Sequence, residues 1–410
     1  MVMRPQTRYS RTSMTPAWNP ALLAHVQLLT TAQGFAAVGV AAAPEPDAPD
    51  ATTSAARFAE WVAAGHAGDM QYLARRNDAG DLLRASARTA IPWARSVLVC
   101  ALNYNLAGPA GPAPRSIDPA PLGTGWIAKY AWTGETLEDE DKVRPTDYHD
   151  DMLDRLQVIE AGIREQVSCE TRCYVDTGPL LERDFAARAG IGWIGKNTCI
   201  LNQNLGSWLL LGVIVTSLPM EMAVTLAPDR CGSCTRCIDA CPTDALFLPT
   251  TDSPMRQMDA SLCIAYLTIE KKGDIPVELR EKIGRQVFGC DICQDVCPWN
   301  RTAPTSAIPG LTRRDELINP ALDWLAKLDA PDFKREFGGS PLERTRRKRL
   351  HRNVAIAMGN SGDLRFVPTL DDWTNADDPV LRDSATWALH RIRPTPAPAS
   401  ASINEPPKSP

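Results

Sequence analysis

Eight of the twelve cysteines lie between residues 231 and 297, in a spacing typical of iron–sulfur chemistry. The first half reads Cys231-x2-Cys234-x2-Cys237-x3-Cys241-Pro242, as in bacterial ferredoxins, where three thiolates bind one 4Fe–4S cluster and the fourth reaches a second cluster. The second half has a lone Cys263 and then Cys290-x2-Cys293-x3-Cys297-Pro298. Counting ligands predicts two 4Fe–4S clusters, one held by Cys231, Cys234, Cys237 and Cys297 and the other by Cys241, Cys263, Cys290 and Cys293.

Zinc is the alternative metal for this set of cysteines, because paired Cys-x2-Cys motifs also build zinc ribbons. A zinc site would not need the x3-Cys-Pro ending that both halves share, so clusters are favoured. The four remaining cysteines stand in apolar or mixed runs, where a buried structural thiol is favoured over a nucleophile: Cys100, Cys169, Cys173 and Cys199.

The composition predicts a folded protein of two or three domains, since 44% of the 410 residues are hydrophobic and 23% are charged. The longest apolar run, Trp208–Leu218, has the length of a strand rather than of a membrane span. No apolar segment follows the N-terminal arginines, so a secretory signal is not expected and a cytoplasmic location is predicted.

A basic segment lies between residues 344 and 352, without a single acidic residue among them, in a chain whose net charge is −5. A solvated helix face, the alternative, would ordinarily carry interspersed acids. Contact with nucleic-acid phosphates is therefore favoured, because such binding needs a local patch of positive charge. The residues predicted to make it are Arg346, Arg347, Lys348, Arg349 and Arg352.

Alternating helical and strand patterns over residues 21–226 predict an α/β domain ahead of the cysteines. Helices are expected from residue 20 and at 58–75 and 151–167, and strands at 35–41, 97–102, 172–175 and 208–216. A ferredoxin-like domain is expected at 227–302 and a stack of HEAT-like helices at 303–393. The ends, 1–20 and 394–410, are predicted to be disordered, 106–122 to be a loop, and the acidic 133–146 to be a solvated insertion.

The segment that starts Asp176-Thr-Gly-Pro-Leu-Leu-Glu-Arg and ends Gly-Lys-Asn197 resembles the signature of the epoxyqueuosine reductases. Tyr130-Ala-Trp and Asp147-Tyr-His149 also match, and with the cysteines and the helical end the resemblance covers about residues 20–392. This family is similar to the reductive dehalogenases, so the resemblance implies a reductive-dehalogenase-like, cobalamin-binding α/β domain with base-off cobalamin. It also implies a tRNA substrate whose wobble-position epoxyqueuosine is reduced to queuosine, an unidentified low-potential electron donor, and a monomer away from membranes.

Asp176 is our candidate catalytic residue, because reduction of an epoxide to an alkene needs a general acid beside the oxirane oxygen. It follows a predicted strand, at the rim where α/β proteins form sites, and burial beside a corrin would raise its pKa into a useful range. The alternative is an aspartate that caps a helix or turn. Asp147-Tyr-His149 is close to a cobalamin motif, but Met152 stands where that motif has glycine, so His149 is not proposed as a cobalt ligand.

The resemblance also implies corrin contacts. Their alternatives are a surface role for Arg84 and a solvated lysine at Lys272, and Arg183 is expected to orient Asp176 or to bind phosphate. The cofactor-binding residues expected are Arg84, Asp176, Lys196, Asn197, Ile200, Leu211 and Lys272.

Three other functions remain open from the sequence. One is a cobalamin-dependent reductase of small organohalides or epoxides, which the basic helical end argues against. Another is an iron–sulfur electron-transfer protein, which would not need some 200 residues of α/β domain. The last is a nucleic-acid-binding module with structural clusters.

Overall fold

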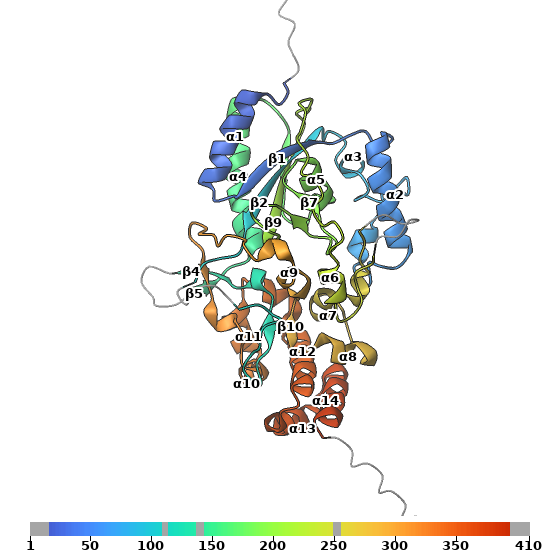
Figure 1. Cartoon of the computed structure of the whole chain (residues 1–410), viewed down its shortest axis with the longest axis vertical. Helices are drawn as coiled ribbons and strands as arrows, with labels where there is room; N and C mark the ends of the chain where they lie inside the picture. The colour runs from blue at the N-terminus through green and yellow to red at the C-terminus, as the bar shows by residue number, and fades with distance from the viewer. Residues whose placement is uncertain (1–15, 109–113, 137–142, 249–255, 394–410) are drawn as a thin grey trace, which may run out of the picture.

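The computed structural model describes residues 16–108, 114–136, 143–248 and 256–393. Its upper layer is a four-stranded sheet in the order β1 (Ala37–Ala42), β2 (Ser96–Asn103), β9 (Leu209–Thr216) and β6 (Thr171–Tyr174) (Figure 1). The predicted strands are confirmed, but every pair in this sheet is antiparallel. Alternation along a sequence does not fix strand direction when connections such as 104–170 are long. The rule that places sites at the rim of a parallel sheet therefore does not apply to Asp176.

Helices cover both faces of the sheet, as the alternation of buried residues along β2 requires. Leu98, Cys100 and Leu102 pack under α1 (Pro20–Ala32) and α4 (Tyr148–Gln166). Val97, Val99 and Ala101 face the other way, where α5 (Glu182–Arg188) contributes Phe185 and Ala186. The fully buried strand β2 therefore has helices packed on both of its faces. The first residues of α4 and α5 lie close to the end of β6.

Two expectations for the N-terminal part need correction. Trp18 is buried and its indole N–H donates to Ser96 Oγ at 2.8 Å, so order begins before residue 20. The helix expected at 58–75 is instead α2 (Pro49–Ala63), followed by the short 3₁₀ helix η1 (Gln71–Ala74). Gly65 and Gly68, with φ of 78° and 54°, turn the chain between them. Residues 1–15 lie outside the described part of the chain.

The cysteine-rich part forms a middle layer of short helices below the sheet (Figure 1). These are α6 (Arg236–Asp239), α7 (Ile264–Ile269), α8 (Val277–Ile283) and α9 (Ile292–Asp295), joined by β10 (Gln286–Phe288). β10 pairs in parallel with β3 (Trp126–Ile127). The acidic 133–146 segment is not wholly solvated, because its ends form β4 (Thr133–Thr136) and β5 (Val143–Pro145) in a sheet with β11 (Thr312–Arg313); residues 137–142 lie outside the described structure.

Helices form the lower layer, as the sequence predicts for residues 303–393. They are α10 (Leu322–Lys327), α11 (Ala330–Phe337), α12 (Arg346–Ser361), α13 (Val367–Trp373) and α14 (Pro379–Ile392), with the turn η6 (Pro341–Thr345) before α12. Their core also takes in Trp126, Trp132 and Phe288, so earlier segments complete it. In the part of the chain described, no helix has the length and apolar character needed to cross a bilayer; the 394–410 tail lies outside it.

Candidate functional site

The eight cysteines of the predicted cluster module lie in the middle layer as free thiols. Burial, with Cys297, Cys231 and Cys234 nearby, raises the pKa of Cys237 to about 11. Burial likewise raises the pKa of Cys290 well above its ordinary value, and its thiol neighbours are Cys263 and Cys241. These neighbours lie within the sets that ligand counting gives, although Cys293 of one set also interacts with Cys237 of the other. Such thiols release protons when a metal binds them, because thiolates are the ligands.

Cys199 is a ninth thiol in the same region. The residue is half-buried, and it interacts electrostatically with Cys293, Cys263 and Cys297, one or more members of each set. Burial of its thiol raises the pKa of Cys199. Cys100 is buried in the sheet core.

Asp176 lies just after β6, with a backbone φ of 55° that few residues other than glycine adopt. Its Oδ2 accepts a hydrogen bond from the Tyr148 hydroxyl at 2.5 Å, and His149 Nε2 lies 3.7 Å from the same oxygen. Its main-chain carbonyl accepts from Arg84 Nη2 at 3.4 Å. The side chain is 57% exposed, so the protein alone does not bury it as expected. A carboxylate held in this way faces solvent, ready for a ligand.

The N-terminus of α4 supplies the partners of Asp176. Asp147 caps the helix by accepting from the main-chain N–H of His149 at 3.0 Å, and its Oδ1 lies 2.8 Å from His149 Nδ1. Although burial alone would raise it, the hydrogen bonds from His149 and the charge of Arg344 hold the pKa of Asp147 below its usual value. Burial and the charge of Asp176 raise the pKa of Tyr148 well above 10, so its hydroxyl remains a donor.

Arg344 belongs to the basic segment for which the sequence predicts contact with nucleic-acid phosphates. No catalytic role is predicted for Tyr148 or His149. Their signal was present in the Asp147-Tyr-His149 match, which was considered only for cobalt ligation. Arg183, by contrast, was expected to orient Asp176 or bind phosphate. Its Nη1 donates to the Thr198 carbonyl at 3.0 Å and to Thr198 Oγ1 at 3.3 Å, so it is engaged on a different loop.

Glu182 has a buried carboxyl group next to this site. Burial, followed by the charge of Asp176, raises its pKa well above the ordinary value. Its Oε1 has no hydrogen-bond partner among the residues that the structure describes. Arg84 also lies here, with its guanidinium 5.7 Å from the centre of the Tyr72 ring. An unpaired buried oxygen of this kind calls for an external donor.

The other residues expected to contact a corrin differ in their surroundings. Lys196 Nζ donates to the carbonyls of Gly232 at 2.8 Å and Cys234 at 3.0 Å, and Asn197 Nδ2 to that of Cys293 at 3.4 Å. These two residues therefore tie the glycine-rich segment to both cysteine loops. Ile200 is 4% exposed within the sheet core, Leu211 is half-buried and Lys272 is exposed.

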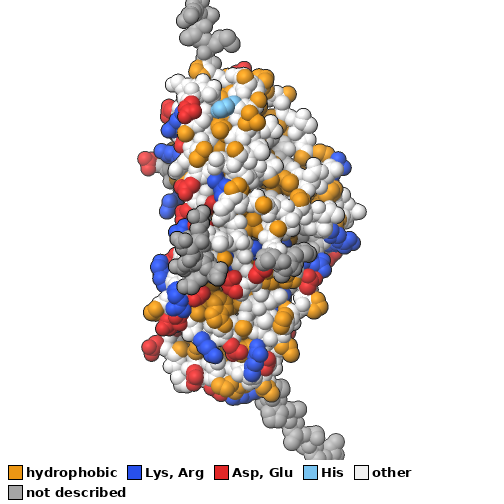
Figure 2. Space-filling view, turned by 90° about the vertical axis from the view of Figure 1, so that its left-hand side faces the viewer, with side chains coloured by type: hydrophobic (Ala, Val, Ile, Leu, Met, Phe, Trp, Pro, Cys, Tyr) orange, Lys and Arg blue, Asp and Glu red, His pale blue; other side chains and the backbone are white. Residues whose placement is uncertain are grey.

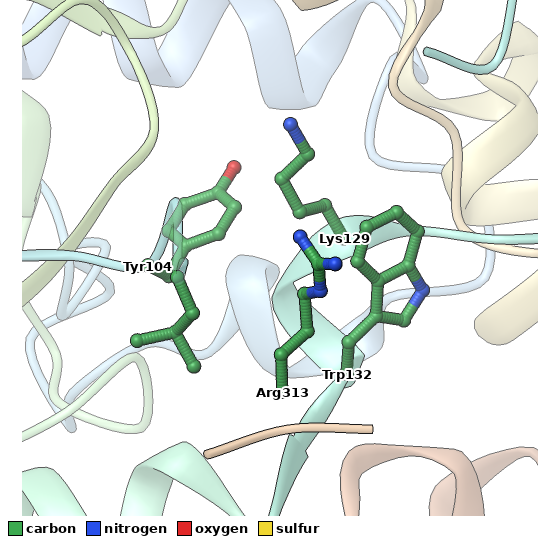
Figure 3. A pocket seen from close by; sticks show the side chains of 5 residues that line it. Tyr104, Lys129, Trp132 and Arg313 are labelled. Atoms are coloured by element: carbon green, nitrogen blue, oxygen red, sulfur yellow. The ribbon is translucent and has the colours of Figure 1, made fainter. Parts of the chain in front are cut away.

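Two pockets lie near these residues. One, of about 190 Å³, is lined by Tyr104, Leu106, Lys129, Trp132 and Arg313 (Figure 3). Ligand pockets ordinarily measure about 300–1,000 Å³, so it is too small for a nucleoside or a corrin. Its Lys129 ammonium lies 4.0 Å from the centre of the Trp208 ring, and burial lowers its pKa. The other pocket adjoins Arg84 and measures only about 20 Å³, room for about one water molecule; it is lined also by Ser54, Ser86, Asp184 and Arg188.

The basic segment divides into exposed and buried members. Arg346 and Lys348 are exposed, while Arg347 and Arg349 are half-buried. Arg352 is 1% exposed, and its guanidinium donates to the carbonyls of Leu267, Lys271 and Gly273. Arg352 is therefore a structural residue and not an available phosphate ligand. It faces inward because α12 packs one of its sides against the core, and Arg352 lies on that side.

Beyond this segment, acidic and basic side chains are interspersed on the face of the molecule in Figure 2. No broad field of positive charge is seen on that face. Recognition of a nucleic acid would thus depend on local groups, as the net charge of −5 suggests.

The fold and the site define an iron–sulfur oxidoreductase. Residues 230–300 match the family model of a 4Fe-4S double cluster binding domain, which decides against zinc, and residues 84–177 match that of epoxyqueuosine reductase QueG, DUF1730. The chain belongs to the epoxyqueuosine reductase family. This overturns the electron-carrier and binding-module alternatives.

Individual relatives agree with that assignment. The epoxyqueuosine reductase of Xanthomonas campestris is 35% identical over 342 residues, which cover 82% of this chain and 87% of that protein. The enzyme of Synechocystis is 37% identical over 77% of this chain and 98% of its own length. A crystal structure of an epoxyqueuosine reductase with an epoxyqueuosine-modified tRNA stem loop matches with a TM-score of 0.75 and 30% identity, over 91% of this chain and 90% of that one.

Proposed function

We propose that this chain reduces the epoxide of epoxyqueuosine, at the wobble position of a tRNA, to the alkene of queuosine. The solved relative with a modified stem loop supports the substrate. The reaction consumes two electrons and two protons, breaks both C–O bonds of the oxirane and releases its oxygen as water. The protein must therefore hold the nucleoside, deliver electrons to carbon and deliver protons to oxygen.

Asp176 is the proton donor in this proposal. The observation that carries the role is its carboxylate, which is exposed to a ligand on one side and held by the Tyr148 hydroxyl at 2.5 Å on the other. Protonation of the oxirane oxygen makes it a better leaving group, which is the contribution expected of a general acid. Tyr148 keeps the carboxyl in place and His149 stands close enough to take part in its re-protonation.

Eight thiolates would hold the electron-carrying groups. We assign Cys231, Cys234, Cys237 and Cys297 to one 4Fe–4S cluster and Cys241, Cys263, Cys290 and Cys293 to the other. The proximity of thiols within each set supports this division. Bound clusters supply electrons one at a time. Lys196 and Asn197 fix the cysteine loops against the catalytic layer, so that the distance between donor and site stays constant.

Cobalamin is the group that we assign to the catalytic layer. One feature of this structure fits it: the unpartnered Oε1 of Glu182, which amide side chains of a corrin would satisfy. When bound, cobalamin supplies a low-potential metal centre that reduces carbon. Of the residues expected to hold it, Arg84 lies closest to Asp176, whose carbonyl accepts from its guanidinium, while Lys196 and Asn197 donate to carbonyls of the cysteine loops.

The exposed cations Arg346 and Lys348, with the half-buried Arg347 and Arg349, are proposed to bind phosphates of the anticodon arm. Lys272 lies on the neighbouring segment, because the Arg349 guanidinium donates to the Glu270 carbonyl at 3.4 Å. The basic segment and the 270–273 turn would thus form one edge of the tRNA site. A looped or flipped base is the form in which RNA sequence is usually read.

The proposal is tested by anaerobic reconstitution with iron, sulfide and cobalamin, followed by reaction with a modified stem loop and a strong reductant. Wild type and Asp154→Asn, an exposed aspartate of α4, should form queuosine, as detected by mass spectrometry of the nucleosides. Asp176→Asn should lose on the order of 100-fold or more in kcat, because general acids typically contribute 10²–10⁴-fold. Normal turnover by Asp176→Asn would remove it from the proton-donor role, and absence of turnover by wild type would refute the function.

A further inference from the structure

Arg344 is the first cation of the basic segment, but its guanidinium turns toward the catalytic residues. It comes from η6, in the helical layer, and its Nη2 lies 2.5 Å from Asp147 Oδ2 and 2.6 Å from His149 Nδ1. Its guanidinium also lies 5.9 Å from the centre of the Tyr148 ring. One side chain of the helical layer thus contacts three consecutive residues at the start of α4.

Two of these three residues lie next to the proposed proton donor, Asp176. Tyr148 donates to Asp176 and His149 lies 3.7 Å from the same carboxylate oxygen. The Asp147 and His149 side chains are only 13% and 15% exposed, whereas that of Arg344 is 42% exposed, so the guanidinium reaches two largely buried acceptors from the edge of the solvent. Hydrogen bonds in which a partner is charged, as here, fix the geometry of the groups they join.

The main chain of Arg344 is tied to the proposed tRNA-binding residues. Its carbonyl accepts a hydrogen bond from Arg349 Nη2. Arg349 also donates to Thr345 at 2.8 Å, which fixes the junction between η6 and α12. The next residue, Arg346, is exposed and has a φ of 56°, an unfavourable value for a side chain of this size. A phosphate bound to Arg346 or Arg349 would therefore act on the same short turn that carries Arg344.

We propose that Arg344 is a positioning residue, through which the tRNA-binding turn holds Tyr148 and His149 against the proton donor Asp176. The inference rests on the proposed function, and it gives a role to an arginine of the basic segment that points toward the catalytic residues. Proton delivery would then be most effective when the turn is held by tRNA. A free epoxyqueuosine nucleoside, which has no phosphates for the turn, would be a poor substrate.

The test compares kcat and KM for the stem loop in Arg344→Gln, Arg344→Lys and Arg346→Gln, with Arg335→Gln as the matched control. Arg335 is an exposed arginine of α11 that pairs with Asp332 and Glu336. Arg344→Gln should lower kcat on the order of 10- to 100-fold with little change in KM, as a misplaced catalytic group does. Arg344→Lys should recover part of that loss, and Arg346→Gln should raise KM, because it removes a proposed phosphate contact.

A double-mutant cycle with Asp147→Asn separates positioning from a general loss of folding. If Arg344 acts through Asp147, the double variant should have nearly the kcat of either single variant rather than the product of the two losses. Iron content and thermal unfolding of each variant should match wild type. Hydrogen exchange supplies a readout that does not depend on turnover: the amides of 176–181 should exchange faster in Arg344→Gln.

Several outcomes would overturn the inference while leaving the proposed function in place. These are a raised KM with unchanged kcat in Arg344→Gln, additive losses in the cycle, or unchanged exchange at 176–181 despite active wild type. Arg344 would then be a phosphate ligand or an ordinary ion pair. Inactivity of wild type on the stem loop would instead count against the proposed function itself.

Discussion

Tyr148 is the side chain on which the geometry of Asp176 depends most directly. It is buried, packs edge-on against Tyr130 at 5.8 Å between ring centroids, and gives its hydroxyl to the carboxylate. Asp176 needs such a partner because its own backbone conformation, with a φ of 55°, is strained. The rigid ring of Tyr148 therefore sets the position of an otherwise exposed acid.

Tyr148→Phe removes this hydrogen bond and keeps the ring. A hydrogen bond to a charged group contributes about 1.5–3 kcal/mol, so kcat should fall roughly 10- to 100-fold. Steady-state turnover of the modified stem loop measures the change. Tyr174→Phe serves as control, because Tyr174 lies two residues before Asp176 and its hydroxyl contacts only the exposed Arg172 among the described hydrogen bonds. Equal losses in both variants would show that the effect is not specific to the acid.

At the scale of elements, α12 serves two roles: its first turn carries the basic segment, and the following turns are buried in the helical core. His351 lies where these roles meet. Its ring is 4% exposed and stacks on Trp373 of α13 at 5.2 Å between centroids. Burial, and next the charge of Arg347, lowers the pKa of His351 from 6.5 to about 4.

This shift predicts that the helical layer is sensitive to acid. The folded state favours neutral His351, so stability is fully present above pH 6.5 and is lost as pH falls toward 4, where the unfolded chain alone binds the proton. The difference corresponds to about 3 kcal/mol. Thermal unfolding measured between pH 7 and 4 should show a smaller loss for His351→Leu than for wild type. His390→Gln, at an exposed position of α14, should behave as wild type; an unchanged pH dependence in His351→Leu would contradict the assignment.

Element identity could be read largely from sequence, whereas pairings across the molecule could not. Strands β2 and β9 were visible as short apolar runs, and the cysteine spacing gave the cluster module. The direction of strand pairing depends on segments far apart in the sequence. The break between α2 and η1 also depends on a distant residue, because Tyr266 lies so close to Gly68 that a side chain at position 68 would collide with it. Asp176 was found by motif, but Tyr148 and Arg344 became site residues only because separate layers fold together.

Arg352 is a residue that the sequence predicted wrongly as a site residue. Its place in a run of cations predicted a phosphate ligand, and the structure buries it against the carbonyls of the 267–273 segment. Charge in a sequence does not reveal which side of a helix faces the interior. Three of the four remaining predicted cations also have protein partners, and only the exposure of Arg346 and Lys348 distinguishes the surface available to RNA.

At the scale of the whole molecule, the cysteine loop at 227–246 has little packing of its own, whereas α7 and α8 in the same layer have a core formed by residues such as Ile264, Leu267 and Leu279. The sheet layer has two large cores and the helical layer has another. The cysteine loops share a small cluster formed by Trp193, Leu201 and Cys297, and much of 227–240 is exposed. Metal–thiolate bonds would therefore supply much of the energy that orders these loops, as they do in other small metal-binding modules.

Removal of iron should consequently open the cysteine loop at 227–246 without unfolding the layers above and below it. After anaerobic chelation, a protease should cut within 228–246 much faster than in the reconstituted protein. The fragments containing the sheet core and the 322–392 helices should stay resistant, because their buried side chains belong to separate cores. Lys196→Gln, which loses the bonds to Gly232 and Cys234, should speed cutting of these loops even with clusters present. Complete digestion after chelation would show instead that all three layers fold as one unit around the clusters, and equal cutting with and without iron would show that the loops are ordered by the polypeptide alone.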